Sequence, residues 1–264
     1  MDEERVIRIK AEVKANFDQS PERYGAFEAE HGFFRRLNER LLSRMELPGG
    51  AWVLDVGCGT GASTLQILGA VPDSRVWGLD ISPAMLEQAR SAVGESDRVS
   101  FVEGDAALLA DYFDFLFDAV VYSASIFLVP DYKESLREAR NLLKTHGSVG
   151  ATFMNGLYDR DGNNLLAVAE EQAKEGVSFK RPVNIQGFQS FFVGMFPHTR
   201  FWVEDLSLPE QLLRDLFSVP AMSAGLFPGT DYPERVRKVG RVFDHMPRTE
   251  ILFRWTLMIG KVHQ

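Results

Sequence analysis

The stretch from residue 52 to residue 154 alternates short apolar segments with segments of helical character. Successive strands that are each joined through a helix run in the same direction, so this alternation predicts βαβ units and a parallel sheet covered by helices on both faces. Nothing else in the chain restricts the possible folds as strongly. The five expected strands are residues 52–56, 74–82, 99–105, 117–125 and 148–154.

Beyond residue 155 the alternation becomes irregular. Residues 156–198 are expected to form a helical, Phe-rich insertion after strand five, and residues 200–208 and 250–262 are expected to be the sixth and seventh strands. The predicted fold class is therefore α/β: a Rossmann-like, seven-stranded, mostly parallel sheet with helices on both faces. Residues 1–47 are expected to be helical.

Several boundary signals support the expected helices. Ser82 and Pro83 begin the helix of residues 83–93, and Gly94 ends it. Capping boxes are expected wherever an N-cap Ser or Asp is followed three residues later by Glu, because the two side chains satisfy each other's backbone N–H groups. At the expected helix starts, the pairs with this spacing are Asp131 with Glu134, Ser207 with Glu210, and Asp231 with Glu234.

The segment of residues 52–63, WVLDVGCGTGAS, places three glycines within five positions directly after the first strand. Glycines there let a ligand lie against the backbone, since a Cβ would occupy that space. Two ligands are compatible with such a loop: a dinucleotide and S-adenosylmethionine (SAM). Gly57-x-Gly59-x-x-Ala62 satisfies the dinucleotide pattern, and Asp80 follows Gly57 at the distance expected for an acid that binds ribose hydroxyls.

Asp55 distinguishes the two ligands. It ends the first strand two residues before Gly57, and we expect its carboxylate to point toward the ligand crevice. A carboxylate beside a pyrophosphate would be repelled, because like charges at short range raise the free energy. SAM has no phosphate, and its ammonium and sulfonium groups attract a carboxylate. The acid therefore favours SAM over NAD.

The segment VLDVGCGTG resembles motif I of the class I SAM-dependent methyltransferases, and four further motifs follow in the family's order over about residues 50–155. VWGLDIS is similar to the second motif, whose terminal acid, here Asp80, would bind both ribose hydroxyls. VEGDA is similar to the third, in which Asp105 would face the adenine amino group and Ala106 would offer its backbone. FDAVVYSAS is similar to the fourth, and LLKTHGSV to a turn usually written LLKPGG.

Within this family the chain resembles the ubiquinone- and menaquinone-type small-molecule methyltransferases. NFDQSPERY is similar to their N-terminal lid, in which Tyr24 would approach the methionine carboxylate of SAM. The resemblance implies a single domain with four parts: an N-terminal helical lid at 1–47, a SAM-binding core at 50–155, a cap insertion at 156–198, and C-terminal strands and helices at 199–264.

The candidate cofactor-binding residues come from the ends of the expected strands and from the lid. Met85 could pack on the adenine or in the core, and Cys58 is expected to be a small loop residue rather than a nucleophile. The full set implied by the resemblance is Tyr24, Asp55, Gly57, Cys58, Gly59, Gly61, Asp80, Ile81, Met85, Asp105, Ala106 and Ser123.

The cofactor motifs do not fix a catalytic group, because SAM already carries an activated methyl group and the protein mainly aligns the acceptor with it. His31 and Tyr122 are candidate catalytic residues, and a structural role is the alternative for each. The five His residues lack metal-ligand spacing, so no metal is expected. The single cysteine, Cys58, excludes cysteine-cluster chemistry.

The net charge of −8 indicates a small-molecule partner rather than a nucleic acid. No apolar run approaches the ~20 residues that span a membrane, and the N-terminus MDEERVIRIK is charged throughout. We therefore expect a cytoplasmic protein without membrane insertion. The oligomeric state is not predicted.

The chain has 20 Phe residues, and eight of them lie between Phe179 and Phe227. The helical spacing of Phe191, Phe192 and Phe196 is compatible with a core and with a cap over an apolar substrate. We favour the cap slightly, because methyltransferases of this kind place specificity elements here.

These observations predict a SAM-dependent methyltransferase that acts on a small, apolar or aromatic acceptor and releases S-adenosylhomocysteine. Two alternatives are a non-catalytic regulatory protein that binds SAM or S-adenosylhomocysteine, and an NAD-linked oxidoreductase. The second alternative leaves Asp55 unexplained.

Overall fold

A computed structural model of the chain describes residues 2–177 and 183–263. Its seven strands form one sheet in the order β3-β2-β1-β4-β5-β7-β6, and pairing is parallel except where β7 meets β5 and β6. The predicted fold class is confirmed. The strands are β1 (Trp52–Val56), β2 (Arg75–Asp80), β3 (Val99–Glu103), β4 (Phe117–Tyr122), β5 (Leu143–Tyr158), β6 (His198–Ser207) and β7 (Leu252–Lys261).

The strand order reverses at β1, which pairs with β2 on one side and with β4 on the other. Connections after β1 and β4 leave the sheet in opposite directions, so a crevice opens at the carboxyl ends of these strands. The glycine loop follows β1 at this point, and Ser123 to Ser125 follow β4. The fold thus places two predicted ligand-binding segments side by side.

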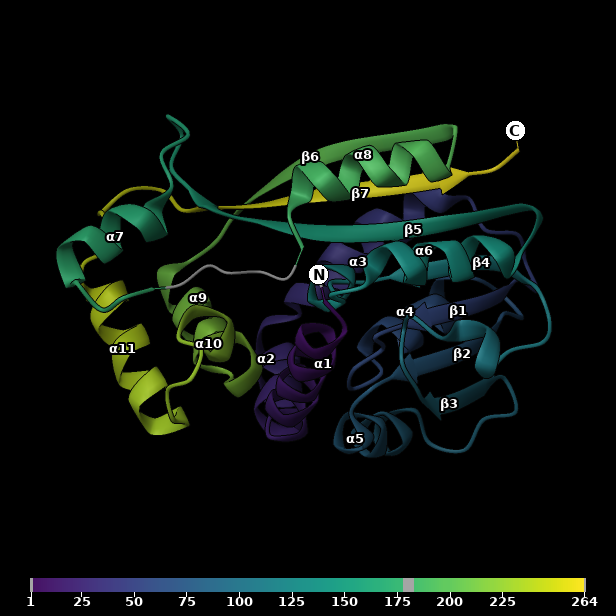
Figure 1. Cartoon of the computed structure of the whole chain (residues 1–264), viewed down its shortest axis with the longest axis horizontal. Helices are drawn as coiled ribbons and strands as arrows, with labels where there is room; N and C mark the ends of the chain where they lie inside the picture. Colours follow the sequence, from purple (N-terminus) through teal and green to yellow (C-terminus); the bar gives the residue numbers. More distant parts are fainter. Residues whose placement is uncertain (1, 178–182, 264) are drawn as a thin grey trace.

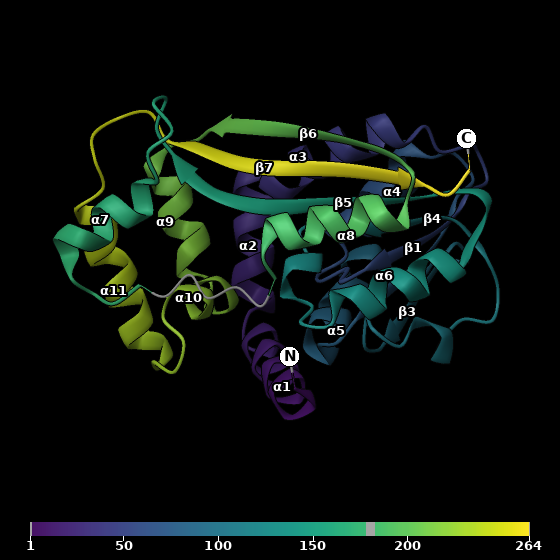
Figure 2. The same cartoon turned by 45° about the horizontal axis from the view of Figure 1, so that its top comes forward.

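Helices cover both faces of the sheet. In Figure 2, α6 (Tyr132–Asn141) and α8 (Ile185–Met195) lie in front of the sheet, and α3 (Phe33–Met45) and α4 (Ala62–Ala70) lie behind it. The amphipathic pattern of α3 explains its position, since its apolar residues from Phe33 to Met45 are buried. α5 (Pro83–Val93) packs beside β2 and β3.

β5 is much longer than the seven residues expected. It runs through Tyr158 because its antiparallel pairing with β7 continues there, past an irregularity in register between Met154 and Gly156. The long strands carry a helical cap at the far left of Figure 1. Its helices are α7 (Leu165–Ala173), α9 (Glu210–Ser218), α10 (Pro220–Leu226) and α11 (Tyr232–Asp244).

The N-terminal helices α1 (Glu3–Asp18) and α2 (Pro21–His31) lie between this cap and the parallel strands (Figure 1). α1 contacts α10 of the cap and α5 of the core, and α2 contacts α9 and α5. These two helices therefore bridge the two parts of the molecule. Two short 3-10 turns, η1 (Leu109–Asp111) and η2 (Ile126–Leu128), complete the described elements.

The phenylalanines of α8 cover the sheet and do not form the cap over a substrate that we favoured. Phe188, Phe192 and Phe196 are fully buried, and α8 packs beside β6 and α6. The rings of Phe188 and Phe153 lie 5.4 Å apart, which shows that α8 covers the sheet. The helical spacing of these residues therefore reflects core packing, and Phe179 lies outside the described residues.

The capping signals differ in outcome. Ser82 and Asp231 accept hydrogen bonds from the backbones of Met85 and Glu234, as expected. Asp131 makes no capping hydrogen bond to its helix, because its carboxylate binds a lysine of α1 instead. Ser207 belongs to β6, and α9 begins after Pro209 without a side-chain cap. In residues 2–177 and 183–263, no helix combines the length and apolarity needed to cross a membrane.

Candidate functional site

A cavity lies where the glycine loop, the end of β4, the lid helices and the cap meet. Nine of the twelve predicted cofactor residues line it, so the fold brings most of the set together. They are Tyr24, Gly57, Gly59, Asp80, Ile81, Met85, Asp105, Ala106 and Ser123.

Gly59 lies where the loop faces the cavity. Its φ is +54°, in the left-handed region that favours glycine, and a Cβ built on it would meet no atom within 4 Å. The space above this residue is therefore open to a ligand. Gly61 differs, because its Cβ would lie 3.2 Å from Ala89 of α5. Gly61 does not line the cavity, and it permits close packing between the loop and α5.

Asp80 is placed at the cavity by hydrogen bonds at both carboxylate oxygens. Its Oδ2 accepts from the backbone N–H of Gly59 at 2.8 Å, and its Oδ1 accepts from that of Ser82 at 2.9 Å. The side chain is nearly buried, and this desolvation raises the pKa of Asp80 to about 6. A carboxylate fixed in this way, with lone pairs still free, is well suited to accept hydrogen bonds from ligand hydroxyls.

Asp55 does not point into the cavity, contrary to our expectation. Its Oδ2 accepts hydrogen bonds from the hydroxyls of Ser63 and Thr64 in the first turn of α4, at 2.6 Å and 2.8 Å. The side chain is fully buried, and burial raises its pKa to about 6. Asp55 thus places an acid at the start of α4, where dinucleotide-binding folds place pyrophosphate.

Cys58 also lies away from the cavity wall. Its thiol is buried beside Gly78 of β2, where a Cβ on that glycine would come within 2.9 Å of Sγ. Burial raises the pKa of the Cys58 thiol, with smaller contributions from the nearby carboxylates. These surroundings make the thiol inert, in agreement with the expectation of a small loop residue.

Asp105 is held by a residue that sequence reasoning missed. Lys10 of α1 donates to Asp105 Oδ2 at 2.6 Å and to Asp131 Oδ2 at 2.5 Å, so one ammonium joins the lid to two segments of the core. The cavity is lined by both Lys10 and Asp105. Nothing in the local sequence indicated Lys10, because its partners lie 95 and 121 residues away.

The cavity also has an apolar, partly aromatic wall. Its residues come from the lid, from the segment after β4, from α10 and from β7. Of these residues, only Phe17 belongs to the lid motif NFDQSPERY. The wall consists of Val13, Phe17, Phe34, Phe127, Leu128, Val129, Pro130, Met222 and Trp255.

Ala124 at the end of β4 has an unusual backbone conformation. Its φ of +55° lies in the left-handed region, and its N–H donates to Thr152 Oγ1 at 2.7 Å. This hydrogen bond to β5 fixes a conformation that a non-glycine residue adopts at a cost of about 1–3 kcal/mol. Ser123, Ala124 and Ser125 all line the cavity, and strained backbone of this kind is common in binding sites.

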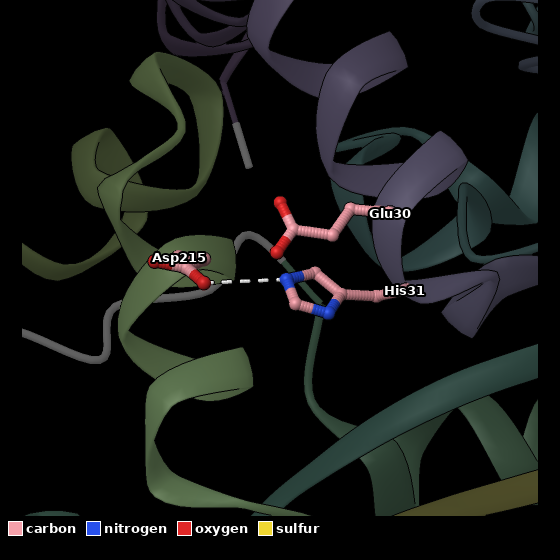
Figure 3. A group of neighbouring side chains, drawn as sticks. All are labelled: Glu30, His31 and Asp215. Carbon is pink, nitrogen blue, oxygen red and sulfur yellow. Dashed lines mark hydrogen bonds and ion pairs between the residues drawn. The ribbon is translucent and has the colours of Figure 1, made fainter.

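Neither candidate catalytic residue lines the cavity. Figure 3 shows His31 on α2 pointing toward Asp215 on α9, with Glu30 beside it. His31 Nε2 lies 3.2 Å from Asp215 Oδ2, and the imidazole packs on Phe27. This contact joins the lid to the cap, which explains a histidine here without a catalytic role.

The group in Figure 3 also bears on the expectation that no metal is bound. The ligand atoms of Glu30, His31 and Asp215 lie within 4.8 Å of one another, close enough to surround a cation. Glu30 is exposed, however, and the hydrogen bond to Asp215 accounts for the position of His31. The absence of a metal stays a prediction.

Tyr122 is fully buried in β4 and lies outside the cavity wall. Its hydroxyl lies 2.7 Å from Ser135 Oγ of α6, and burial raises its pKa. This position supports the structural alternative, and the catalytic role of Tyr122 stays an untested prediction. The alternation of β4 places its side chain on the α6 face of the sheet.

Comparison with known proteins shows what the core of this chain is similar to. Residues 53–147 match the family model described as a methyltransferase domain. Among curated proteins, the chain is 34% identical to a trans-aconitate 2-methyltransferase of Enterobacter sp. (strain 638), over 59% of this chain and 58% of that protein. It is 33% identical to a demethylmenaquinone methyltransferase of Staphylococcus aureus (strain Newman), over 55% and 58%. The chain spans less than two thirds of the length of these relatives.

Solved structures extend the similarity of the fold to most of the chain. The [4+2]-cyclase SpnF superposes with a TM-score of 0.57 at 22% identity, over 87% of this chain and 81% of that one. The YcgJ protein from Bacillus subtilis gives 0.59 at 17% identity, over 87% and 99%. The protein therefore has the Rossmann-like methyltransferase fold. Residues 53–147 of this fold match a methyltransferase domain, and this match agrees with the motifs that resemble those of class I SAM-dependent methyltransferases.

Proposed function

We propose that this protein is a SAM-dependent methyltransferase that acts on a small acceptor with an apolar or aromatic body. The observation that carries the proposal is a single cavity with two unlike walls. One wall contains Gly59 and Asp80, and the other consists of side chains such as Phe127 and Met222. A methyltransferase needs this combination, because cofactor and acceptor must meet in one enclosed space.

The residues of the first wall fit an adenosyl ligand. The open space at Gly59 accommodates a ligand against the backbone, and the carboxylate of Asp80 is available for ribose hydroxyls. Met85 offers an apolar surface, and Asp105 lies at the same wall. Bound SAM would supply an activated methyl group on a sulfonium centre.

The chain's own contribution is orientation and the exclusion of water. Lid residues such as Phe17 and Tyr24 and the cap residue Met222 close the cavity over the core. A dry site favours transfer from a sulfonium cation, because its charge is lost in the transition state. No residue of the described wall is assigned as a general base.

Thermal unfolding with SAM, S-adenosylhomocysteine and NAD as separate ligands tests the cofactor. A ligand that binds only the native state raises the unfolding temperature with the logarithm of its concentration above Kd. We expect a rise with both adenosyl ligands and none with NAD. Stabilisation by NAD alone would support an oxidoreductase and contradict the proposal.

Turnover of SAM to S-adenosylhomocysteine then tests catalysis. The assay compares uncharged aromatic acceptors with the carboxylate trans-aconitate, the compound in the name of one relative. We expect methyl transfer to members of the first group. Tight binding of SAM without turnover on any acceptor would point to the regulatory alternative.

A further inference from the structure

The indole of Trp255 is a buried polar group in the wall of the cavity. Trp255 lies in β7, is 1% exposed and lines the cavity, and its Nε1–H has no hydrogen-bond partner among residues 2–177 and 183–263. Buried donors in folded proteins are almost always satisfied, so an orphan donor beside a cavity indicates a group that arrives with a ligand or a water.

The indole cannot easily turn to find a partner elsewhere. Its ring packs on those of Phe253, Phe33 and Phe127, with centroid separations of 5.2, 6.0 and 6.1 Å. The backbone of Trp255 is paired with Met154 on one side and with Glu204 on the other. The donor is therefore held in a fixed position by the pairing of β7 and by the packing of its ring.

The charges around the cavity restrict what can meet this donor. Asp80 and Asp105 line the wall, and Asp131 lies beside it. Lys10 is the cation of the described wall, and it is already bound to Asp105 and Asp131. An anionic ligand would meet an excess of negative charge, so this site disfavours carboxylates.

We propose that Trp255 recognises the acceptor: its Nε1–H donates a hydrogen bond to a carbonyl or hydroxyl oxygen of an uncharged, otherwise apolar molecule. This inference rests on the proposed function, because it identifies the apolar wall as the acceptor site. The apolar body packs against residues such as Phe127 and Met222, and the single oxygen satisfies the orphan donor.

Matched probes of one shape test this assignment. 1-Indanone carries a carbonyl that can only accept a hydrogen bond, indane has no oxygen, and indane-2-carboxylate is an anion. Each is titrated into the protein with saturating S-adenosylhomocysteine and again without it. We expect 1-indanone to bind about three- to tenfold more tightly than indane, the range of one neutral hydrogen bond, and the carboxylate to bind most weakly.

Two variants test whether the preference for 1-indanone over indane depends on the indole of Trp255. Trp255→Phe removes the donor and keeps an aromatic ring, so the preference for 1-indanone is expected to vanish or reverse. Trp202→Phe makes the same change on the neighbouring strand, outside the cavity wall, and is expected to retain it. In the wild type, the indole N–H resonance of Trp255 is expected to move with 1-indanone and to move less with indane.

Several results would overturn the proposal. Equal affinities for 1-indanone and indane would mean that a water satisfies the donor. Undetectable binding of 1-indanone would also contradict the proposal, as would a preference for 1-indanone that persists in Trp255→Phe. Binding of the carboxylate as tight as that of 1-indanone would overturn the uncharged class. Absence of S-adenosylhomocysteine binding, with a preference that still depends on Trp255, would defeat the proposed methyl transfer and leave the recognition by Trp255 intact.

Discussion

The glycine loop after β1 and the apolar wall line one cavity, but they do so by different means. The loop acts through backbone geometry, together with one carboxylate, Asp80, held by backbone N–H groups. The apolar wall acts through side chains from distant segments, such as Met222 of α10 and Trp255 of β7. A wall formed by local backbone geometry needs the same short sequence pattern in every protein that uses it. A wall formed by packed side chains can differ in sequence when the ligand differs.

The largest expected effect tests the first wall. Asp80→Ala leaves the ribose hydroxyls without a charged acceptor, and such hydrogen bonds are worth about 1.5–3 kcal/mol. SAM affinity measured by calorimetry is therefore expected to fall by roughly ten- to a hundredfold. Asp97→Ala in an exposed loop is the control and should bind normally. Unchanged affinity in Asp80→Ala would contradict the ribose assignment.

The raised pKa of Asp80 predicts a pH dependence of the same contact. Its pKa is about 6 in the ligand-free protein, so the carboxyl becomes protonated as the pH falls through 6. The ionised carboxylate of Asp80 only accepts hydrogen bonds, whereas the protonated form also donates one. A ligand that requires the ionised form should bind about tenfold more weakly at pH 5 than at pH 7.

Calorimetric titrations of SAM across this range give the test. Asp80→Asn should bind with little dependence on pH, since residue 80 no longer titrates. Asp55→Asn is the matched control, because the pKa of Asp55 is also about 6 but its carboxylate does not line the cavity. If the pH dependence disappeared only in Asp55→Asn, the titrating group would be Asp55. That result would contradict the prediction for Asp80.

The same contrast explains which parts of the structure could be predicted from the sequence. The parallel core was predictable because its strands alternate with helices that carry local boundary signals, such as Ser82 and Gly94 around α5. Asp55 was assigned correctly to the first strand, but its hydrogen bonds were not predicted, because Ser63 and Thr64 compete for its carboxylate. Strand alternation alone could not show that competition.

The second wall was less predictable for a physical reason. Lys10, Phe127 and Trp255 meet only when segments more than a hundred residues apart pack together. Their local patterns describe a helix, a turn and a strand, and carry no sign of the cavity. The Phe-rich stretch misled us because buried rings on α8 have the same spacing whether they cover a sheet or a substrate.

A smaller effect tests whether Lys10 fastens the lid to the first wall. Lys10→Met removes the ion pairs from α1 to Asp105 and Asp131, and pairs near a surface are worth up to about 1 kcal/mol. Amide exchange in α1 should accelerate by up to about fivefold, measured by hydrogen–deuterium exchange. Lys14→Met is the control, since its pairs are longer and more exposed. Equal acceleration in both variants would show that the fastening is not specific to Lys10.

The smallest expected effect concerns His31, which joins the lid to the cap and does not reach the cavity. His31→Ala loses a partly exposed contact with Asp215 and packing on Phe27. The free energy of unfolding, measured in denaturant, should therefore fall by about 1 kcal/mol. Affinities for SAM and 1-indanone should not change. Asp215→Ala should show a similar loss, and the double variant should lose less than the sum, because the two residues share one contact. A tenfold fall in methyl transfer by a stably folded His31→Ala protein would instead restore the catalytic hypothesis, and it would require the lid to move His31 into the cavity when ligand binds.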